Sequence, residues 1–399
     1  MIQIEIGETG PGQPVPVNAS QAMLLARSGV VNAALSTVRA GWWQVSGAGK
    51  VGAARIGDVA VCIRPKVPIA RLLFLAGYAE FGPAWRTEDV RVDSAAGLVP
   101  AMADALWRQV ARAIHQGLLP GYLEVEESSA VLRGRLRESE QLRRHHGLPL
   151  PLEIRHDEFT VDIAENQILR AACERVLKVP GVRGEALLRL RRLLREFGDV
   201  TPLGRRDPVP AWQATRLNAR YHSALRLAEL VLGATSVEHA PGDVAVNGFL
   251  LDMPVLFESF VSKALSGFLA GRYGGRVHSQ DWNPFDMAGL VRLRPDLVWK
   301  VAGAPVAVVD AKYKDESPGG YPNADLYQLL AYCTVLGLRH GHLVYAKGSA
   351  EAAQHAVRRS GIEIRCHALD LTAQPADLLA QVSQLADHIA ERAGAALIR

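Results

Sequence analysis

The segment from Arg294 to Lys314 reads RPDLVWKVAGAPVAVVDAKYK, and few structures other than a β-hairpin with charged ends suit it. Two apolar runs, LVW and VAVV, flank the tight turn AGAP, which favours their pairing as antiparallel strands. Asp296 precedes the first run, and Asp310 and Lys312 end the second. Because side chains alternate along a strand, we expect Asp310 and Lys312 on one face, beside Asp296 from the neighbouring strand.

Length and composition indicate an ordinary soluble protein of several domains. A chain of 399 residues is long for one core, and 49% hydrophobic with 22% charged residues is typical of globular proteins. There is no run of 18 apolar residues and no secretory signal pattern in MIQIEIGETG, so we expect a cytoplasmic protein that contacts no membrane. The four cysteines are widely separated, which predicts neither a disulfide framework nor structural zinc.

The order of strand and helix patterns predicts an α/β and α+β protein of three parts. Residues 1–125 contain strand-like runs (IQIEI, GWWQV, VGAARIGDVAVCIRPKV) and helical runs (SQAMLLARSG, IARLLFLAGYAEFG), which indicates a β-rich and helical region. Residues 126–235 start with an extended charged run and become mainly helical, with a capped helix from about Asp162. Residues 240–399 alternate helices and strands, which predicts an α/β domain with its boundary near residue 240.

Charge is unevenly distributed along the chain. Residues 132–235 hold 19 Lys and Arg against 13 Asp and Glu, whereas residues 236–399 hold 15 against 17. A basic middle region suits contact with phosphates, and solvated helix faces explain it equally well.

The segment SGAGKVG, residues 46–52, resembles a phosphate-binding loop but does not match one. The GxxxxGK[ST] pattern requires Gly at position 44, where Gln44 stands, and Ser or Thr at position 51, where Val51 stands. Strand-like runs lie on both sides, so we expect a glycine-rich hairpin turn and no nucleotide site in this chain.

The two aspartates and the lysine of the opening segment are suited to phosphodiester hydrolysis. Carboxylates that hold Mg²⁺ can activate water and offset charge on phosphate oxygens, and a lysine can assist either task. Asp296, Asp310 and Lys312 are therefore the predicted catalytic residues, and Glu258 in the preceding helical run can complete the acidic, metal-binding cluster. Lys314 lies about 7 Å further along the strand, which predicts a phosphate contact or a surface position.

The same segment resembles a known nuclease motif. RPD, thirteen residues and then DAK resemble the PD-(D/E)xK motif, and QLLAY, with Gln328 and Tyr332 four residues apart on one helix face, resembles the QxxxY element of RecB-like members. The segments IRPKVPIARLLFLAGYA, LRGRL, DEFTVDIAENQIL and LFESFV resemble the McrC family, the nuclease subunits of McrBC modification-dependent restriction systems.

The resemblance implies a restriction-endonuclease-like domain at 240–399 and a division of labour with a partner. McrC-like proteins cut double-stranded DNA with modified cytosine in complex with McrB, an AAA+ hexamer that hydrolyses GTP, and their N-terminal part stimulates that hydrolysis. Mg²⁺ is then the cofactor here, and GTP belongs to the partner. Arg133, Arg135 and Asn166 are candidates for contact with the motor. Two alternatives remain: a non-cleaving adaptor that activates the GTPase, and a stand-alone RecB-like repair nuclease.

Overall fold

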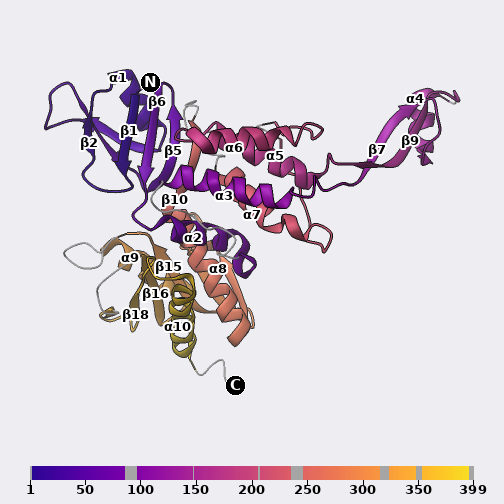
Figure 1. Cartoon of the computed structure of the whole chain (residues 1–399). Helices are drawn as coiled ribbons and strands as arrows, with labels where there is room; N and C mark the ends of the chain where they lie inside the picture. Colours follow the sequence, from indigo (N-terminus) through magenta and orange to yellow (C-terminus); the bar gives the residue numbers. More distant parts are fainter. Residues whose placement is uncertain are drawn as a thin grey trace. The chain divides into compact units, whose positions relative to one another are not determined.

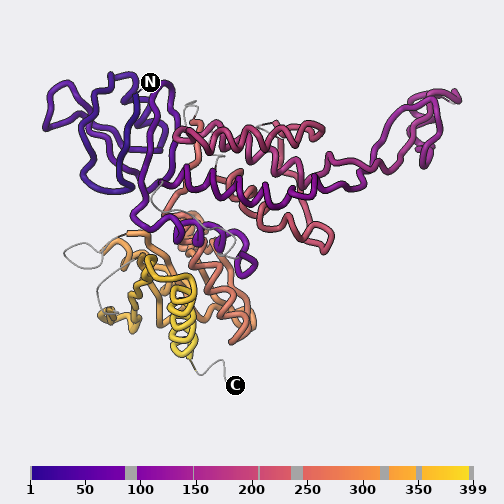
Figure 2. The backbone as a smooth tube through the Cα atoms, viewed as in Figure 1, coloured from indigo at the N-terminus to yellow at the C-terminus, as the bar shows by residue number. Residues whose placement is uncertain are grey.

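The computed structural model describes residues 2–85, 97–146, 148–204, 207–234, 246–314, 323–346 and 353–394 (Figure 1, Figure 2). The chain divides into two compact units, one formed by residues 1–101 with 237–399 and the other by residues 102–236. Helices and several sheets occur together, which confirms the expectation of a mixed α/β protein with more than one unit. The boundary predicted near residue 240 lies outside the described residues.

The first unit begins with two small sheets around one apolar core. A four-stranded sheet has the order β1-β6-β5-β10, and a three-stranded sheet has the order β2-β4-β3. The strands are β1 (Ile2–Gly7), β2 (Gln13–Val15), β3 (Val31–Leu35), β4 (Trp43–Gly47), β5 (Lys50–Ile56), β6 (Val59–Arg64) and β10 (Val246–Asp252). Alternate side chains such as Ile4, Val45 and Val61 fill the core, as the period-two pattern predicts.

Helix α1 (Ala19–Arg27) covers part of this core. Asn18 and Gln21 cap its start reciprocally, with the Gln21 amide nitrogen donating to the Asn18 side chain over 2.8 Å and the Asn18 amide nitrogen donating to the Gln21 side chain over 3.0 Å. Ala22 and Leu25, on the inner face, are fully buried. The predicted helix is therefore present.

The prediction for SGAGKVG needs one correction. The segment does connect two strands, β4 and β5, but these strands belong to different sheets and do not pair with each other. It is a crossing between sheets rather than a hairpin turn. The strand that pairs with β5 on one side is β6, and on the other side it is β10, which comes from far along the chain.

The second unit combines helices with a long β-hairpin. Its elements are α3 (Leu98–Ala113, which begins just before the unit's first residue), β7 (Gly121–Ser129), β8 (Arg135–Leu136), α4 (Glu138–His145), β9 (Leu152–Thr160), α5 (Ala164–Leu177), α6 (Gly184–Arg195) and α7 (His222–Ala234). β7 and β9 pair over nine residues, and β8 joins β9 on its other edge. Helix α5 packs against α6 and α7. Asp162 does not cap α5 but accepts hydrogen bonds from Gln167 and Thr201.

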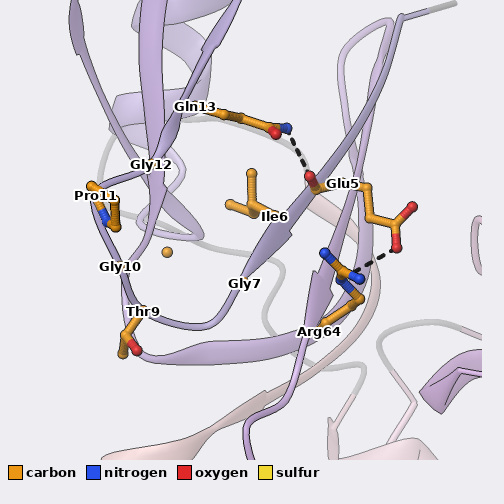
Figure 3. A pocket seen from close by; sticks show the side chains of 10 residues that line it. Glu5, Ile6, Gly7, Thr9, Gly10, Pro11, Gly12, Gln13 and Arg64 are labelled. Carbon is orange, nitrogen blue, oxygen red and sulfur yellow. Dashed lines mark hydrogen bonds and ion pairs between the residues drawn. The ribbon is translucent and has the colours of Figure 1, made fainter.

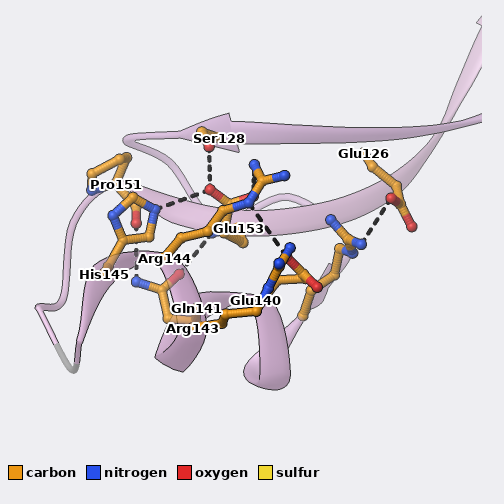
Figure 4. A network of polar contacts seen from close by, with 10 residues as sticks. Glu126, Ser128, Glu140, Gln141, Arg143, Arg144, His145, Pro151 and Glu153 are labelled. Carbon is orange, nitrogen blue, oxygen red and sulfur yellow. Dashed lines mark hydrogen bonds and ion pairs between the residues drawn. The ribbon is translucent and has the colours of Figure 1, made fainter.

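A polar network fastens α4 to β9 at the end of this hairpin (Figure 4). The Glu153 carboxylate accepts hydrogen bonds from Ser128 and His145, and these bonds lower its pKa. Gln141, which is buried, donates to the carbonyls of Leu148 and Pro151 over 2.9 and 3.0 Å, and accepts from the Glu153 amide over 2.7 Å. One side chain thus satisfies three backbone groups of the returning segment.

The C-terminal part of the first unit is built on a six-stranded mixed sheet with the order β11-β14-β15-β16-β18-β17. The strands are β11 (Arg276–Ser279), β14 (Leu297–Val301), β15 (Ala304–Lys312), β16 (His340–Ala346), β17 (Ala353–Ala356) and β18 (Glu363–Leu369). A two-stranded ribbon of β12 (Asn283–Pro284) and β13 (Arg292–Leu293) lies between β11 and β14 in sequence. The central strands are apolar because both faces of the sheet are covered.

Three long helices pack on this sheet (Figure 1): α8 (Met253–Tyr273), α9 (Asn323–Leu336) and α10 (Pro375–Ala393). Leu329 and Cys333 of α9 share a core cluster with Val308, Leu343 and Cys366 of the strands. Helix α10 packs on α8 and contacts the same strands.

Among the described residues, only helix α8 has the length and the apolar composition that a membrane-spanning helix needs. Half of that stretch is buried, and the helix packs on α2 (Ile69–Phe81) through Phe260, whose ring centroid lies 5.9 Å from Phe74 and 5.6 Å from Tyr78. Its apolar surface therefore serves the packing of the first unit.

Candidate active site

The β14–β15 hairpin places the two predicted aspartates side by side. Ala302 and Gly303 form its two-residue turn, both with positive φ (52° and 85°), the conformation that suits the twist of paired strands. Leu297 pairs with Val309, so Asp296 lies opposite Asp310. The Asp296 carboxylate accepts the backbone N–H of Ala311 over 2.8 Å, which fixes it across the end of β15.

Asp310 and Lys312 lie on the same face of β15, as alternation predicts. Lys312 Nζ lies 2.5 Å from Asp310 Oδ2. The Asp310 side chain is 2% exposed and that of Lys312 17%, so this ion pair is largely shielded from water.

Helix α9 holds the ammonium from the other side. Lys312 Nζ donates to Gln328 Oε1 over 3.0 Å, Gln328 Nε2 donates to the Tyr332 hydroxyl over 2.7 Å, and that hydroxyl donates to the Arg294 carbonyl over 3.3 Å. Gln328 and Tyr332 are one helical turn apart, which allows them to act in series. This line of hydrogen bonds connects the lysine to the chain just before Asp296.

The close approach of α9 depends on Gly341 in β16. A Cβ atom at this position would lie 2.6 Å from Cys333 Sγ and 2.9 Å from Leu329 Cγ. Both contacts are shorter than van der Waals distance and both belong to α9. A side chain at position 341 would therefore push away the helix that carries Gln328 and Tyr332.

The fourth predicted residue, Glu258, reaches the site from α8. This helix is capped by Asp252, whose carboxylate accepts the Val255 amide over 3.3 Å, and it starts directly where β10 ends. Gln280 Nε2 donates to Glu258 Oε1 and, over 3.1 Å, to Asp296 Oδ1. The amide group of Gln280 thus bridges the two carboxylates.

Gln280 is a site residue that the sequence reasoning missed. It follows β11 in a left-handed conformation with φ of 56°, and its backbone N–H donates to the Asp296 carbonyl over 3.1 Å. The positive φ is uncommon for a residue other than glycine, and such conformations occur preferentially at functional sites. A glutamine at a strand end gives no recognisable signal unless the pairing of β11 with β14 is known.

Negative charge exceeds positive charge in this cluster, where three carboxylates lie around the Lys312 ammonium. Burial and the charge of Asp296 raise the pKa of Asp310 to about 7, although Lys312 is in contact with it. Burial and the charges of Asp296 and Asp310 likewise raise the pKa of Glu258 to about 7. Burial alone would lower the pKa of Lys312, but the charge of Asp310, its hydrogen bond and the charges of Asp296 and Asp325 together outweigh burial, so the pKa of Lys312 is raised. The ammonium therefore stays protonated, and a further cation beside the carboxylates would favour their charged forms.

These residues fit a partial ligand set for a divalent cation. Within the ranges that the structure describes, no three His, Cys, Asp or Glu side chains are arranged as a complete metal site. Mg²⁺, however, takes one or two protein carboxylates and completes its shell with water or substrate oxygens. Asp296 and Asp310 lie opposite each other at the end of the hairpin, so oxygens of both carboxylates can supply such ligands.

Lys314 is exposed, in agreement with the predicted surface position, and it forms an ion pair that the sequence did not predict. Its Nζ donates to both carboxylate oxygens of Asp325, at 2.7 and 3.0 Å, and Tyr345 donates to the same carboxylate over 3.2 Å. Asp325 is buried in the first turn of α9. Lys314 is thus a surface residue, with a side chain that is 46% exposed, and it also neutralises a buried carboxylate and holds the start of α9.

The three residues proposed for motor contact lie in the second unit, with different exposures. Arg133 and Arg135 are exposed near the end of the β7–β9 hairpin, so their role stays a prediction. Asn166 is fully buried and donates to the carbonyls of Leu119 and Val161 over 2.9 and 2.7 Å. The assignment of Asn166 is therefore wrong, because its side chain serves the packing of α5.

A hollow of about 170 Å³ lies beside β1 (Figure 3), and Asp296, Asp310 and Glu258 are not among the residues that line it. It is lined by the glycine-rich segment Gly7–Gln13 and by Arg64, which pairs with Glu5 over 3.4 Å. Gln13 closes one side by donating to the Glu5 carbonyl over 2.7 Å. The ion pair is exposed, and the hollow does not include Asp296, Asp310 or Lys312.

Comparison with known proteins places the chain in a family. The family model described as "McrBC 5-methylcytosine restriction system component" matches residues 47–346. No curated protein matches the chain. A chain of the Thermococcus gammatolerans assembly of McrB AAA+ hexamers with bound McrC superposes with a TM-score of 0.62 at 18% identity, covering 97% of this chain and 100% of that chain. A chain of the cryo-EM structure of the Thermococcus gammatolerans McrBC complex superposes with a TM-score of 0.41 at 19% identity. That match covers 67% of this chain and 88% of that chain.

At 18% identity the first of these likenesses shows a shared fold. The family match is the stronger finding, because it extends over more than half of the 399 residues and includes both Asp296 and Lys312. The chain belongs to the family of McrBC 5-methylcytosine restriction system components.

Proposed function

We propose that this protein is the Mg²⁺-dependent endonuclease subunit of a McrBC-like restriction complex, with a PD-(D/E)xK active site in its C-terminal α/β part. The observation that carries the proposal is the arrangement of Lys312, which contacts Asp310 on its own strand and Gln328 on α9 while Asp296 lies across the hairpin. Two carboxylates and one ammonium on one sheet end are what phosphodiester hydrolysis requires.

The residues divide the chemical work. Asp296 and Asp310 would hold the cation, with Glu258 beside them, and Mg²⁺ when bound supplies positive charge to phosphate oxygens and lowers the pKa of water. Gln280 keeps Glu258 and Asp296 at a fixed separation. The carboxylates with raised pKa can accept a proton from the attacking water.

Lys312 is better suited to stabilise charge than to act as a base. Its raised pKa keeps it protonated at neutral pH, and an ammonium donates but does not accept protons. Held by Asp310 and Gln328, it can direct one N–H toward a phosphate oxygen as negative charge develops there. Gln328 and Tyr332 are positioning residues in this arrangement.

The partner we propose is an AAA+ GTPase of the McrB type. In the Thermococcus gammatolerans assembly, McrC is bound to McrB AAA+ hexamers. The present chain lacks a phosphate-loop sequence and its last part holds 15 basic against 17 acidic residues, so delivery of DNA by another protein is consistent with its charge. The family description points to 5-methylcytosine in the substrate DNA.

The test is cleavage of methylated and unmethylated duplex DNA by the chain with and without its GTPase partner, GTP and Mg²⁺. Asp310→Asn should abolish cleavage and leave partner binding and GTP turnover unchanged. Asp377→Asn, an exposed carboxylate in the first turn of α10, is the matched control and should cut normally. Cleavage by Asp310→Asn would refute the site.

Two other functions give different results in the same assay. A GTPase-activating adaptor would stimulate GTP hydrolysis while the unsubstituted chain leaves every DNA intact. A stand-alone RecB-like nuclease would cut with Mg²⁺ in the absence of partner and GTP.

A further inference from the structure

The ribbon formed by β12 and β13 carries a group of exposed apolar side chains directly before the active-site aspartate. Met287 is 106% exposed, Leu290 85%, Trp282 59%, Val291 51% and Phe285 49%. Contiguous exposed apolar side chains of this size on a soluble protein mark an interaction surface. None of them contributes to the apolar cluster between the sheet and α9.

The ribbon is preformed. Asn283 pairs with Leu293 and Pro284 with Arg292, and the Phe285 amide donates to the Val291 carbonyl over 2.8 Å. At the turn, Asp286 acts as a brace. Its carboxylate accepts the Val291 amide over 2.8 Å and its carbonyl accepts the Gly289 amide over 3.0 Å. Apolar side chains on such a braced turn can enter a partner without a large ordering cost.

The base of the ribbon is attached to the active site. The Arg294 carbonyl accepts the Tyr332 hydroxyl, and the Arg294 guanidinium is near enough to Glu258 to favour its charged form. From Asp296 back to Leu290 the chain spans at most about 20 Å even when fully extended. The apolar turn therefore lies within about six base pairs of any phosphate bound at Asp296.

The charge around the ribbon suits nucleic acid. Arg292 and Arg294 are exposed on the returning strand, and the Arg294 guanidinium lies 5.2 Å from the Trp282 ring centroid. Of the two aspartates here, Asp281 is neutralised by Lys300 at 2.6 Å, and Asp286 accepts a hydrogen bond inside the turn. Positive charge thus remains next to the apolar turn, as in proteins that contact phosphates and insert side chains between bases.

We propose that the Trp282–Leu293 ribbon enters a groove of the DNA beside the scissile phosphate, where Met287 and Leu290 wedge between stacked bases while Arg292 and Arg294 contact the flanking phosphates. This inference rests on the proposed nuclease function. Met, Leu and Phe are the side chains that DNA-bending proteins use as wedges, and the local unstacking kinks the duplex. A kink at the cut site exposes the scissile phosphate to Asp296 and Lys312.

The experiment uses the assembled complex with the GTPase partner, in which the chain carries Asp310→Asn so that the DNA stays intact. Methylated duplexes contain 2-aminopurine at successive positions, and its fluorescence rises when the base unstacks. We expect a rise at one or two adjacent positions. Adding Met287→Ser with Leu290→Ser should remove that rise, whereas Met23→Ser, at an exposed methionine of α1, should preserve it.

Cleavage gives the second readout, with Asp310 restored. Met287→Ser with Leu290→Ser should lower the cleavage rate by about tenfold or more, the usual effect of removing a side chain that stacks on a base. Arg292→Ala should weaken DNA binding and reduce its salt dependence by about one counterion.

The outcomes separate this inference from the proposed function. Unstacking that is lost in the double variant supports the wedge even if Asp310→Asn turns out to cut DNA, which would refute only the nuclease site. A fluorescence rise that survives the double substitution, or no rise at any position, overturns the wedge. If the double substitution changes the mass of the complex but not the fluorescence, the ribbon mediates self-association. That result also overturns the wedge.

Discussion

Replacing the buried carboxylate of Asp310 with the neutral amide of asparagine should stabilise the metal-free protein while it abolishes cleavage. Asp310 is 1% exposed, and burial with the charge of Asp296 raises its pKa from 3.8 to about 7. An acid with a raised folded-state pKa binds more protons in the folded state, so the free energy of unfolding falls as the pH rises. The free-energy cost of ionising Asp310 in the folded protein is absent below about pH 4. It grows between about pH 4 and pH 7 and is complete above about pH 7.

The size of the effect follows from the pKa difference. A rise of about three units in the pKa of Asp310 corresponds to a cost of about 4 kcal/mol for its ionised form at pH 8. This value is an upper limit, because relaxation around the ionised group lowers the cost. We expect Asp310→Asn to raise the free energy of unfolding by about 2 kcal/mol at pH 8, and by less than half as much at pH 5. The amide preserves the shape of the side chain, so no cavity offsets the gain.

Urea denaturation of the full chain in EDTA at pH 8 and pH 5 measures this difference. Asp377→Asn should leave the free energy of unfolding unchanged at both pH values, since Asp377 is exposed. Millimolar Mg²⁺ should stabilise the unsubstituted protein, because the cation binds the carboxylates of the folded state. The difference in the free energy of unfolding between Asp310→Asn and the unsubstituted protein should therefore become smaller. An Asp310→Asn protein that is less stable than the unsubstituted one at pH 8, or a gain that does not change with pH, would refute the reasoning.

Four further perturbations test other parts of the structure. Gln328→Leu leaves the Lys312 ammonium without its partner on α9 and should reduce the cleavage rate about tenfold or more with little change in GTP turnover, while Gln328→Glu should retain part of the rate. Gly341→Val should displace α9 and lower the free energy of unfolding by about 2 kcal/mol, measured by urea denaturation, because its Cβ already overlaps Cys333 Sγ. Burial lowers the pKa of His367 from 6.5 to about 4, so the stability of the unsubstituted protein should fall relative to His367→Gln as the pH drops through that interval, in the same denaturation assay. Gln141→Ala leaves three backbone groups of the α4–β9 junction without partners, so hydrogen exchange of residues 148–153 should accelerate while exchange in α5 stays constant.

Local sequence patterns predict the centre of the candidate site well. The apolar runs, the AGAP turn and the period of two place Asp310 beside Lys312 and opposite Asp296, and all three contacts depend on residues within about 20 positions of one another. The Gln328–Tyr332 pair follows from the helical repeat, and its hydrogen bonds to Lys312 and Arg294 agree with that spacing.

Contacts between distant segments are what the sequence cannot supply. Gln280 reaches Glu258 and Asp296 only because β11 pairs with β14 and because the chain turns left-handed at that residue. SGAGKVG has the composition of a hairpin turn, yet the partners of its flanking strands lie elsewhere. Asn166 stands in a motif-like segment, and only the packing of α5 shows that its amide is used internally.

The pairing of β10 with β5 has a consequence for how the chain is made. Residues 50–56 emerge from the ribosome nearly 200 positions before their edge partner at 246–252, and residues 102–236 form a separate unit in between. Since chain growth adds about 5–20 residues per second, the β5 edge of the N-terminal sheet has no partner strand for roughly 10 to 40 seconds during synthesis. The inserted unit can already fold during this time. The nascent sheet is thus completed by the strand that directly precedes the helix of Glu258. A chain truncated before residue 246 therefore lacks an edge strand of its N-terminal sheet as well as the candidate site residues.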